Sequence, residues 1–292
     1  MILDDFDSRP GSATSLLRTF VGSQLRQLGG WISSADLVRI MEALGVPANG
    51  ARSAIARVKL KGLLVPEVVN GRQGYRLNPE AVPMFQRGDR RIFSFRQQRE
   101  DDNWCLISFS IPEPRRDARH QLRRRLGWIG CGTVATGLWI CAASLKDEVL
   151  VILDDLHLRE CATLFIAGRP DVGGSDVGGS DVGLSAAGRP DAGRSLADAA
   201  AQWWDLERLR TLHERFLAQH AAQVGPAASD AEVFARYIHA LDQWRVIPYL
   251  DPGLPDSALP AGWPGHASLQ LFGGISRSLA ARAHAFARSS AS

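Results

Sequence analysis

Residues 48–77 read ANGARSAIARVKLKGLLVPEVVNGRQGYRL and decide how the first third of the chain folds. Apolar residues recur every three or four positions in the first half of this stretch, at Ala51, Ala54, Ile55 and Val58. That spacing predicts a helix that ends at Gly62, because one of its faces can be buried. Two strand-like runs follow, residues 63–69 and 74–77, and Asn70-Gly71 between them is the strongest short-range signal of a β-hairpin.

Two further helices are predicted upstream of this stretch. The first covers residues 15–25, and the second is capped by Ser33 or Ser34 and stops at Gly45. Three helices followed by a β-hairpin are typical of a winged helix-turn-helix, which we expect over residues 13–95. Basic residues lie on the third helix and the hairpin, at Arg52, Arg57, Lys59, Lys61 and Arg72. This combination predicts a DNA-binding module.

Composition and charge agree with a folded protein that carries a basic N-terminal module. The chain has 292 residues, of which 45% are hydrophobic and 22% charged, so wholesale disorder is excluded. Residues 1–100 have 15 Lys and Arg against 9 Asp and Glu, while the whole chain has a net charge of +3. A positive module on a slightly negative remainder favours a polyanion as its partner.

Sequence signals for a membrane, a secretory pathway or a metal are missing. No apolar run approaches the roughly 20 residues that cross a bilayer, and the acidic N-terminus lacks a signal-peptide pattern, so we expect a cytoplasmic protein without a membrane partner. The 4 cysteines form no Cys-x-x-Cys pair, which indicates neither a zinc site nor a disulfide framework. We expect no cofactor and no metal.

A second domain, ferredoxin-like and of α+β type, is predicted over residues 100–167. Its pattern reads strand, helix, strand, strand, with the strands starting at Trp104, Gly137 and Glu148. We expect the remaining ranges to be a disordered tail at 1–12, a flexible low-complexity insert at 168–195, a helical C-terminal domain at 196–280 and a tail at 281–292. The fold class is therefore α+β multidomain.

Two motifs have both an ordinary and a functional interpretation. Gly130 to Ala135 fits the spacing G-x-G-x-x-A of dinucleotide sites, but a helix precedes it and a strand pattern follows, so a tight turn is favoured. The helix at residues 115–126 presents six arginines outward; a solvated face is favoured over a contact with DNA or ligand phosphates. No motif of nucleophilic or phosphoryl-transfer catalysis is present, and no catalytic residue is assigned.

Several stretches, in order along nearly the whole chain, resemble the PaaX-like transcriptional repressors of phenylacetic acid catabolism. They include SLLRTFVG at residues 15–22, RSAIAR at 52–57, GRQGYRL at 71–77, LGWIG at 126–130 and WRVIPYLDPGLP at 244–255. The resemblance implies a dimeric repressor with an N-terminal winged helix, a central domain similar to a small CRISPR nuclease, and a C-terminal helical domain. It also implies an aryl-CoA thioester, phenylacetyl-CoA, as the effector that releases the operator.

The sequence departs from the family pattern at Ala56, at Lys59-Leu60 and at Asp242, where many relatives have a histidine. The first central strand ends Phe109-Ser110-Ile111, whereas the CRISPR nuclease has a metal-holding aspartate at the end of that strand. Nuclease activity is therefore not expected.

On this interpretation the third helix lies in the major groove of operator DNA and the wing follows the adjacent backbone. The predicted DNA-binding residues are Asn49, Arg52, Ser53, Arg57, Lys59, Lys61, Arg72, Gln73 and Arg76. The first four are expected to face the bases, whereas the lysines, Arg72 and Arg76 serve phosphates. If the dimer has two-fold symmetry, the operator is roughly palindromic.

For the effector, we expect Trp244 and Arg245 to offer an aromatic surface and a cation to a CoA phosphate or carboxylate, although Arg245 can equally pair with an acid such as Asp251. Two rival functions remain at this point. A DNA-architectural protein would bind DNA with little sequence preference and without an effector, and an enzyme of CoA metabolism would need a nucleophile or base that the sequence does not display.

Overall fold

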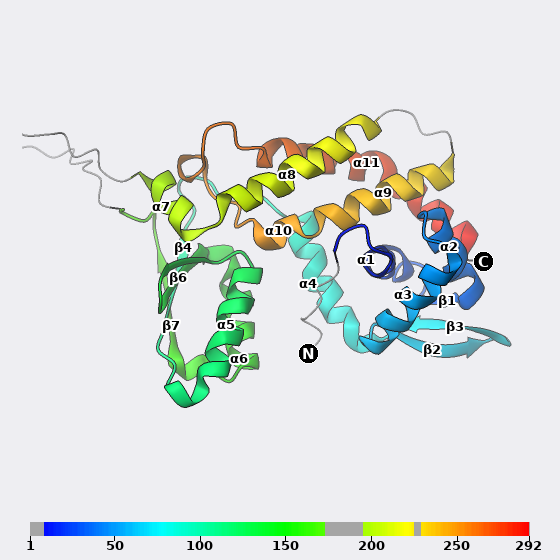
Figure 1. Ribbon diagram of the computed structural model, residues 1–292, viewed down its shortest axis with the longest axis horizontal. Coiled ribbons are helices and arrows are strands. Elements are labelled where there is room, and N and C mark those ends of the chain that lie inside the picture. Colours follow the sequence, from blue (N-terminus) through cyan, green and yellow to red (C-terminus); the bar gives the residue numbers. More distant parts are fainter. Residues whose placement is uncertain (1–8, 173–194, 225–228, 292) are drawn as a thin grey trace, which may run out of the picture. The chain divides into compact units, whose positions relative to one another are not determined.

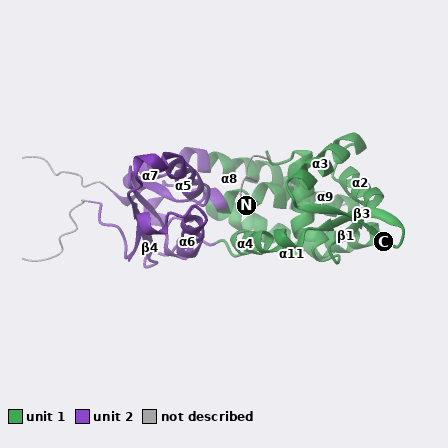
Figure 2. Ribbon diagram, turned by 90° about the horizontal axis from the view of Figure 1, so that it is seen from below, with its two compact units in different colours: residues 1–95, 210–248, 264–292 green, residues 96–209, 249–263 purple. Residues whose placement is uncertain are grey.

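The computed structural model describes residues 9–172, 195–224 and 229–291 of the chain (Figure 1). It divides into two compact units (Figure 2). One unit consists of residues 1–95, 210–248 and 264–292, and the other of residues 96–209 and 249–263. The repeats predicted as a flexible insert at 168–195 lie mostly outside the described residues.

The N-terminal part of the first unit has the predicted order of helices and hairpin. Its elements are α1 (Ala13–Phe20), a π-helical turn (Val21–Leu25), β1 (Trp31–Ser33), α2 (Ser34–Ala43), α3 (Ala48–Leu60), β2 (Leu64–Val69), β3 (Arg72–Leu77) and α4 (Val82–Phe93). The strands form an antiparallel sheet in the order β1-β3-β2. Asn70 and Gly71 both have positive φ, at 51° and 76°, as a tight two-residue hairpin turn requires. The helix α4 has no counterpart among the predicted elements.

The helices α1 and α2 each begin at a serine that caps the first turn. Ser33, not Ser34, caps α2, because its hydroxyl accepts a hydrogen bond from the Asp36 amide at 3.1 Å. Ser12 caps α1 in the same way, through the amide of Ser15. The predicted disordered tail at 1–12 is therefore too long: residues 1–8 lie outside the described part, but Ser12 is the N-cap of a helix.

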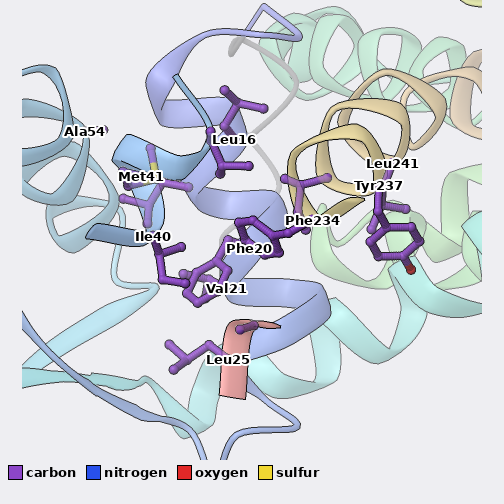
Figure 3. Packing of buried hydrophobic residues seen from close by; sticks show 14 of the residues in the cluster. Leu16, Phe20, Val21, Leu25, Ile40, Met41, Ala54, Phe234, Tyr237 and Leu241 are labelled. Atoms are coloured by element: carbon purple, nitrogen blue, oxygen red, sulfur yellow. The ribbon is translucent and has the colours of Figure 1, made fainter. Parts of the chain in front are cut away.

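C-terminal helices complete the core of the first unit. They are α9 (Asp230–Trp244), α11 (Gly265–Ser290) and the later part of α8 (Leu206–His220). Figure 3 shows Phe234, Tyr237 and Leu241 of α9 in the same apolar cluster as Leu16 and Phe20 of α1. The rings of Phe20 and Phe234 meet edge to face, with centroids 6.3 Å apart.

This packing corrects the expected domain boundaries at the C-terminus. Residues 196–280 do not form a domain of their own, since α9 and α11 share one hydrophobic core with α1, α2 and α3. The predicted tail at 281–292 is wrong up to Ser290, because α11 continues to that residue and buries Ala283 and Ala287. An alanine every four positions is a weak apolar signal in a sequence, but it forms a flat stripe against which another helix packs closely.

The second unit consists of a four-stranded antiparallel sheet with helices. Its elements are β4 (Trp104–Phe109), α5 (Arg116–Trp128), β5 (Gly132–Ala135), β6 (Leu138–Ala142), α6 (Lys146–Asp155), β7 (Ala162–Ala167), α7 (Leu196–Trp203) and, across the boundary with the first unit, α10 (Ile247–Leu250). The strand order is β5-β6-β4-β7. A second core, separate from the first, lies among α5, α6 and the strands.

The strand predicted from Glu148 is wrong, since residues 146–155 form α6. The run of five apolar residues there suits either element, and the structure settles it: Val149, Ile152 and Leu153 are buried at helical spacing, while Val151 is 44% exposed. The turn expected at this motif is confirmed at Gly130, which has a φ of 84° after α5, and the rest of the motif, Gly132–Ala135, forms β5.

Candidate nucleic-acid interface

Helix α3 is held by one buried face and presents the other to solvent. Its buried side chains are Ala51, Ala54, Ile55 and Val58. The predicted DNA-binding residues of this region all lie on the exposed side, namely Asn49, Arg52, Ser53, Arg57, Lys59 and, directly after the helix, Lys61. Burial of three or four residues per two turns thus fixes the direction in which the polar residues point.

The two arginines of α3 have protein partners that orient them differently. Arg52 donates from Nη1 to Oδ1 of Asn49, one turn earlier, at 3.1 Å. Arg57 donates from Nη1 to the hydroxyl of Thr14 on α1, also at 3.1 Å. The two guanidinium groups therefore lean to opposite sides of the exposed face.

The wing is fastened to α2 through a buried carboxylate that the sequence analysis missed. Asp36 is fully buried, and its Oδ2 accepts hydrogen bonds from Nη2 of Arg72 at 2.7 Å and from the hydroxyl of Ser33 at 2.6 Å. Arg39 of α2 pairs with the other oxygen. The spacing Ser33-x-x-Asp36 at a helix start was the available signal, since it resembles a capping box. Arg72 is thus both an anchor of the wing and a half-exposed cation.

The remaining wing residues differ in their partners. Arg76 donates from Nε to Oε2 of Glu67 on the neighbouring strand at 2.6 Å, so part of its charge is neutralised within the hairpin. Gln73 is exposed beside the turn, opposite Val68. The wing therefore presents less net positive charge than a count of its arginines indicates.

A groove of about 520 Å³ lies between α2, α3 and β3. Arg52, Ala56 and Lys59 of α3 line one side of it, and Tyr75 of β3 contributes the aromatic ring. The groove opens on the exposed face of α3, so it combines two cations with an apolar lining at the place where the sequence predicts DNA.

The three residues predicted to bind an effector occupy structural positions. Trp244 is fully buried, stacks on Phe272 with centroids 4.8 Å apart and donates to the Ile92 carbonyl at 3.2 Å. Asp251, in the second unit, is also buried and accepts from the amide of Gly253 at 2.7 Å.

Arg245 belongs to a polar cluster that ties α1 to α9. The acid with which it pairs is Asp242, whose Oδ1 lies 3.2 Å from Nε of Arg245. The same oxygen accepts from the hydroxyls of Ser15 at 2.7 Å and Thr19 at 2.6 Å, and Oδ2 accepts from the Gly11 amide at 2.7 Å. Asp242 lies more than 220 positions from Gly11, Ser15 and Thr19 in the chain, so no local sequence pattern marks this cluster.

Five of the six arginines at residues 115–125 are engaged within the second unit. Arg115 and Arg119 pair with Glu160 and Glu113, Arg123 donates to the Thr136 carbonyl, Arg125 lies 3.7 Å from Asp155, and Arg124 lies over the ring of Trp128. These contacts support the interpretation of this helix as a solvated face with internal partners.

Within the described ranges, no group of three or more His, Cys, Asp or Glu side chains is arranged to hold a metal ion. In the same part of the chain, no helix combines the length and the apolar character needed to cross a membrane.

Comparison with known proteins assigns the three regions to one family. Residues 12–81 match PaaX-like protein, residues 97–176 match the PaaX protein central Cas2-like domain, and residues 204–289 match the PaaX-like protein C-terminal domain. The transcriptional repressor PaaX of Escherichia coli (strain K12) is 25% identical over 283 residues, which cover 95% of this chain and 83% of that protein.

Among solved structures, the uncharacterized protein Rv0674 from Mycobacterium tuberculosis is similar in fold. It has a TM-score of 0.53 and 21% sequence identity, over 94% of this chain and 98% of that one. The three matches along the chain, in the order expected from the sequence, show that this protein belongs to the PaaX-like family, a family of transcriptional regulators rather than enzymes.

Proposed function

We propose that this protein is a DNA-binding transcriptional repressor of an aromatic-acid catabolic operon, of the phenylacetate type. The observation that carries the proposal is the exposed face of α3, which bears the predicted DNA-binding residues beside the β2–β3 hairpin. In this proposal α1, α2, α3 and the hairpin act as a winged helix-turn-helix, with α3 in the major groove and the hairpin along the backbone. The similarity to the Escherichia coli repressor supports the same function.

The proposed roles follow from what each side chain can reach. Asn49, Arg52, Ser53 and Arg57 face the bases, where one bidentate arginine–guanine contact contributes about 1–3 kcal/mol of discrimination. Lys59, Lys61, Arg72 and Arg76 serve the phosphates, and so contribute affinity and salt dependence rather than specificity. Gln73, exposed on the wing, contacts DNA without a charge. The pairing of Arg72 with the buried Asp36 supports a wing that is already oriented before DNA binds.

The effector and the assembly state are part of the same proposal. We assign an aryl-CoA thioester as the effector and a homodimer as the species that binds DNA. The second unit is assigned a ferredoxin-like fold, and most of it lies between the DNA-binding and C-terminal segments in the sequence. An effector lowers operator affinity only by the ratio of its affinities for the two states, so it must bind an element that moves between them. The α1–α9 contact, held by Asp242, is the candidate element in the first unit.

An electrophoretic titration on the promoter of the gene's own operon tests the proposal. At fixed salt, Arg57→Ala should weaken operator binding by about 1–3 kcal/mol and random DNA less, whereas Arg72→Ala should weaken both alike. Arg116→Ala, which removes one exposed charge from the second unit, is the matched control and should change neither. Equal losses on operator and random DNA for Arg57→Ala would remove the base-reading role.

The effector is tested in the same assay with phenylacetyl-CoA and related acyl-CoAs. Release of the operator by an aryl-CoA, and not by free CoA, supports the proposed ligand class. Indifference to every CoA ester would leave a repressor with another effector. Binding without sequence preference would favour the architectural alternative, and turnover of an acyl-CoA would favour the enzymatic one.

A further inference from the structure

Leu60 is the most exposed large apolar side chain in the described part of the protein, with 84% of its surface accessible. It is the last residue of α3 and lies between Lys59 and Lys61. A single exposed leucine is ordinary on a protein surface, so the meaning of Leu60 depends on the side chains around it.

Leu60 continues a line of uncharged side chains along the middle of the exposed face of α3. Asn49, Ser53, Ala56 and Leu60 follow one another at intervals of four, three and four positions and are all exposed. Residues at these intervals lie one above another on a helix, here on the side opposite the buried Ala51, Ala54 and Val58.

Cations border this line on both sides. Arg52 and Lys59 line the groove toward α2 and β3, whereas Arg57 leans toward α1 through its bond to Thr14. An uncharged strip with cations on both sides fits the major groove, where the strip and the two arginines can face base edges while Lys59 reaches a phosphate backbone. From Asn49 to Leu60 the line is about 16 Å long, at about 1.5 Å per residue, which corresponds to about five base steps.

We propose that Ala56 and Leu60 read thymine in the operator by contact with its 5-methyl group. This inference rests on the proposed DNA-binding function and names the base that one end of α3 recognises. The thymine methyl is the apolar group that a base pair presents in the major groove, and alanine is among the side chains that contact it. An aliphatic surface of another protein is a poorer partner for this face than DNA is. It would cover Leu60 but would offer no anions to Lys59 and the neighbouring cations.

The test removes the methyl group and nothing else. A high-affinity duplex is first selected from a random pool by the full-length protein, and each thymine is then replaced singly by deoxyuridine, which has the same hydrogen-bonding edge. We expect one or two positions per half-site at which binding weakens about fourfold, the effect of one buried methyl group.

Variants assign the effect to the two residues. Leu60→Ala should reduce the loss at one of these positions to less than about twofold, and Leu60→Met should restore it, since methionine again offers an apolar side chain. Ala56→Gly should likewise reduce the loss of binding on deoxyuridine substitution, at a neighbouring thymine position. Val68→Ala removes an exposed apolar side chain from the wing, 64% accessible, and should keep the full sensitivity.

The outcomes separate this inference from the proposed function. Failure to select any duplex contradicts the DNA-binding function itself, and the inference falls with it. Selected duplexes that bind equally well with deoxyuridine at every position refute the thymine contact alone. A Leu60→Ala variant that keeps the sensitivity but changes the oligomeric state in sedimentation also refutes it, and assigns Leu60 to a protein interface.

Discussion

Replacing Asp242 should uncouple the C-terminal helix α9 from α1. Its carboxylate is fully buried and accepts hydrogen bonds from Gly11, Ser15 and Thr19, besides its ion pair with Arg245, which is 12% exposed. In Asp242→Ala the guanidinium loses its counter-ion while still largely buried, which costs about 3–5 kcal/mol. That is a large part of the about 5–15 kcal/mol by which a domain is stable.

The milder variant Asp242→Asn separates the contributions. Asparagine keeps one acceptor oxygen for the Ser15 and Thr19 hydroxyls, but its amide nitrogen faces the Gly11 amide, which also donates. Loss of that bond and of the charge should cost about 1–3 kcal/mol. Arg282→Ala breaks the exposed pair with Asp230 and serves as the control, at about 0–1 kcal/mol.

Hydrogen exchange followed by mass spectrometry measures the effect where it occurs, because the chain has two compact units and a single global transition need not report on one of them. Peptides from α1 and α9 should lose protection together in Asp242→Ala, while peptides from β4 and β6 should not. The double variant with Arg245→Ala should be less destabilised than the sum of the two single ones. A cost below about 1 kcal/mol for Asp242→Ala, or strict additivity, would refute the reasoning.

Three further outcomes follow from the same contacts. Burial raises the pKa of Tyr237, so its contribution to the free energy of unfolding is present below the ordinary tyrosine pKa and is lost as the pH rises above it. In Tyr237→Phe the free energy of unfolding should therefore fall less at alkaline pH, as urea titrations at a series of pH values would show. Residues 1–95 alone should show no cooperative thermal transition by circular dichroism, since their core includes side chains of α9 and α11; a sharp transition would contradict this. A hydrogen bond with Cys141 and burial raise the pKa of the Cys105 thiol, so iodoacetamide should modify the partly exposed Cys161 first, as peptide mapping would show.

The sequence predicted best what is encoded over short distances. Asn70-Gly71 specified the hairpin and the apolar spacing of residues 51–58 specified α3, because turn chemistry and helical periodicity are local. The apolar run from Glu148 was predicted as a strand because a short apolar stretch has no decisive period. Packing against the sheet selected the helix instead.

Contacts between distant segments could not be predicted. Nothing near Asp242 in the sequence marks Ser15 and Thr19 as its partners, and nothing near Asp36 marks Arg72. For the candidate site, sequence patterns supplied the exposed polar residues of α3, but the exposure of Leu60 became visible only once the surrounding helices were in place.

The central claim is that α3 recognises a particular DNA sequence, and a competition titration tests it most directly. Labelled promoter DNA from the protein's own operon is bound at fixed, near-physiological salt and displaced by unlabelled promoter or by a scrambled duplex of equal length and composition. The account predicts that the promoter competes at least about a thousandfold better than the scrambled duplex. Equal competition by the two duplexes would contradict it.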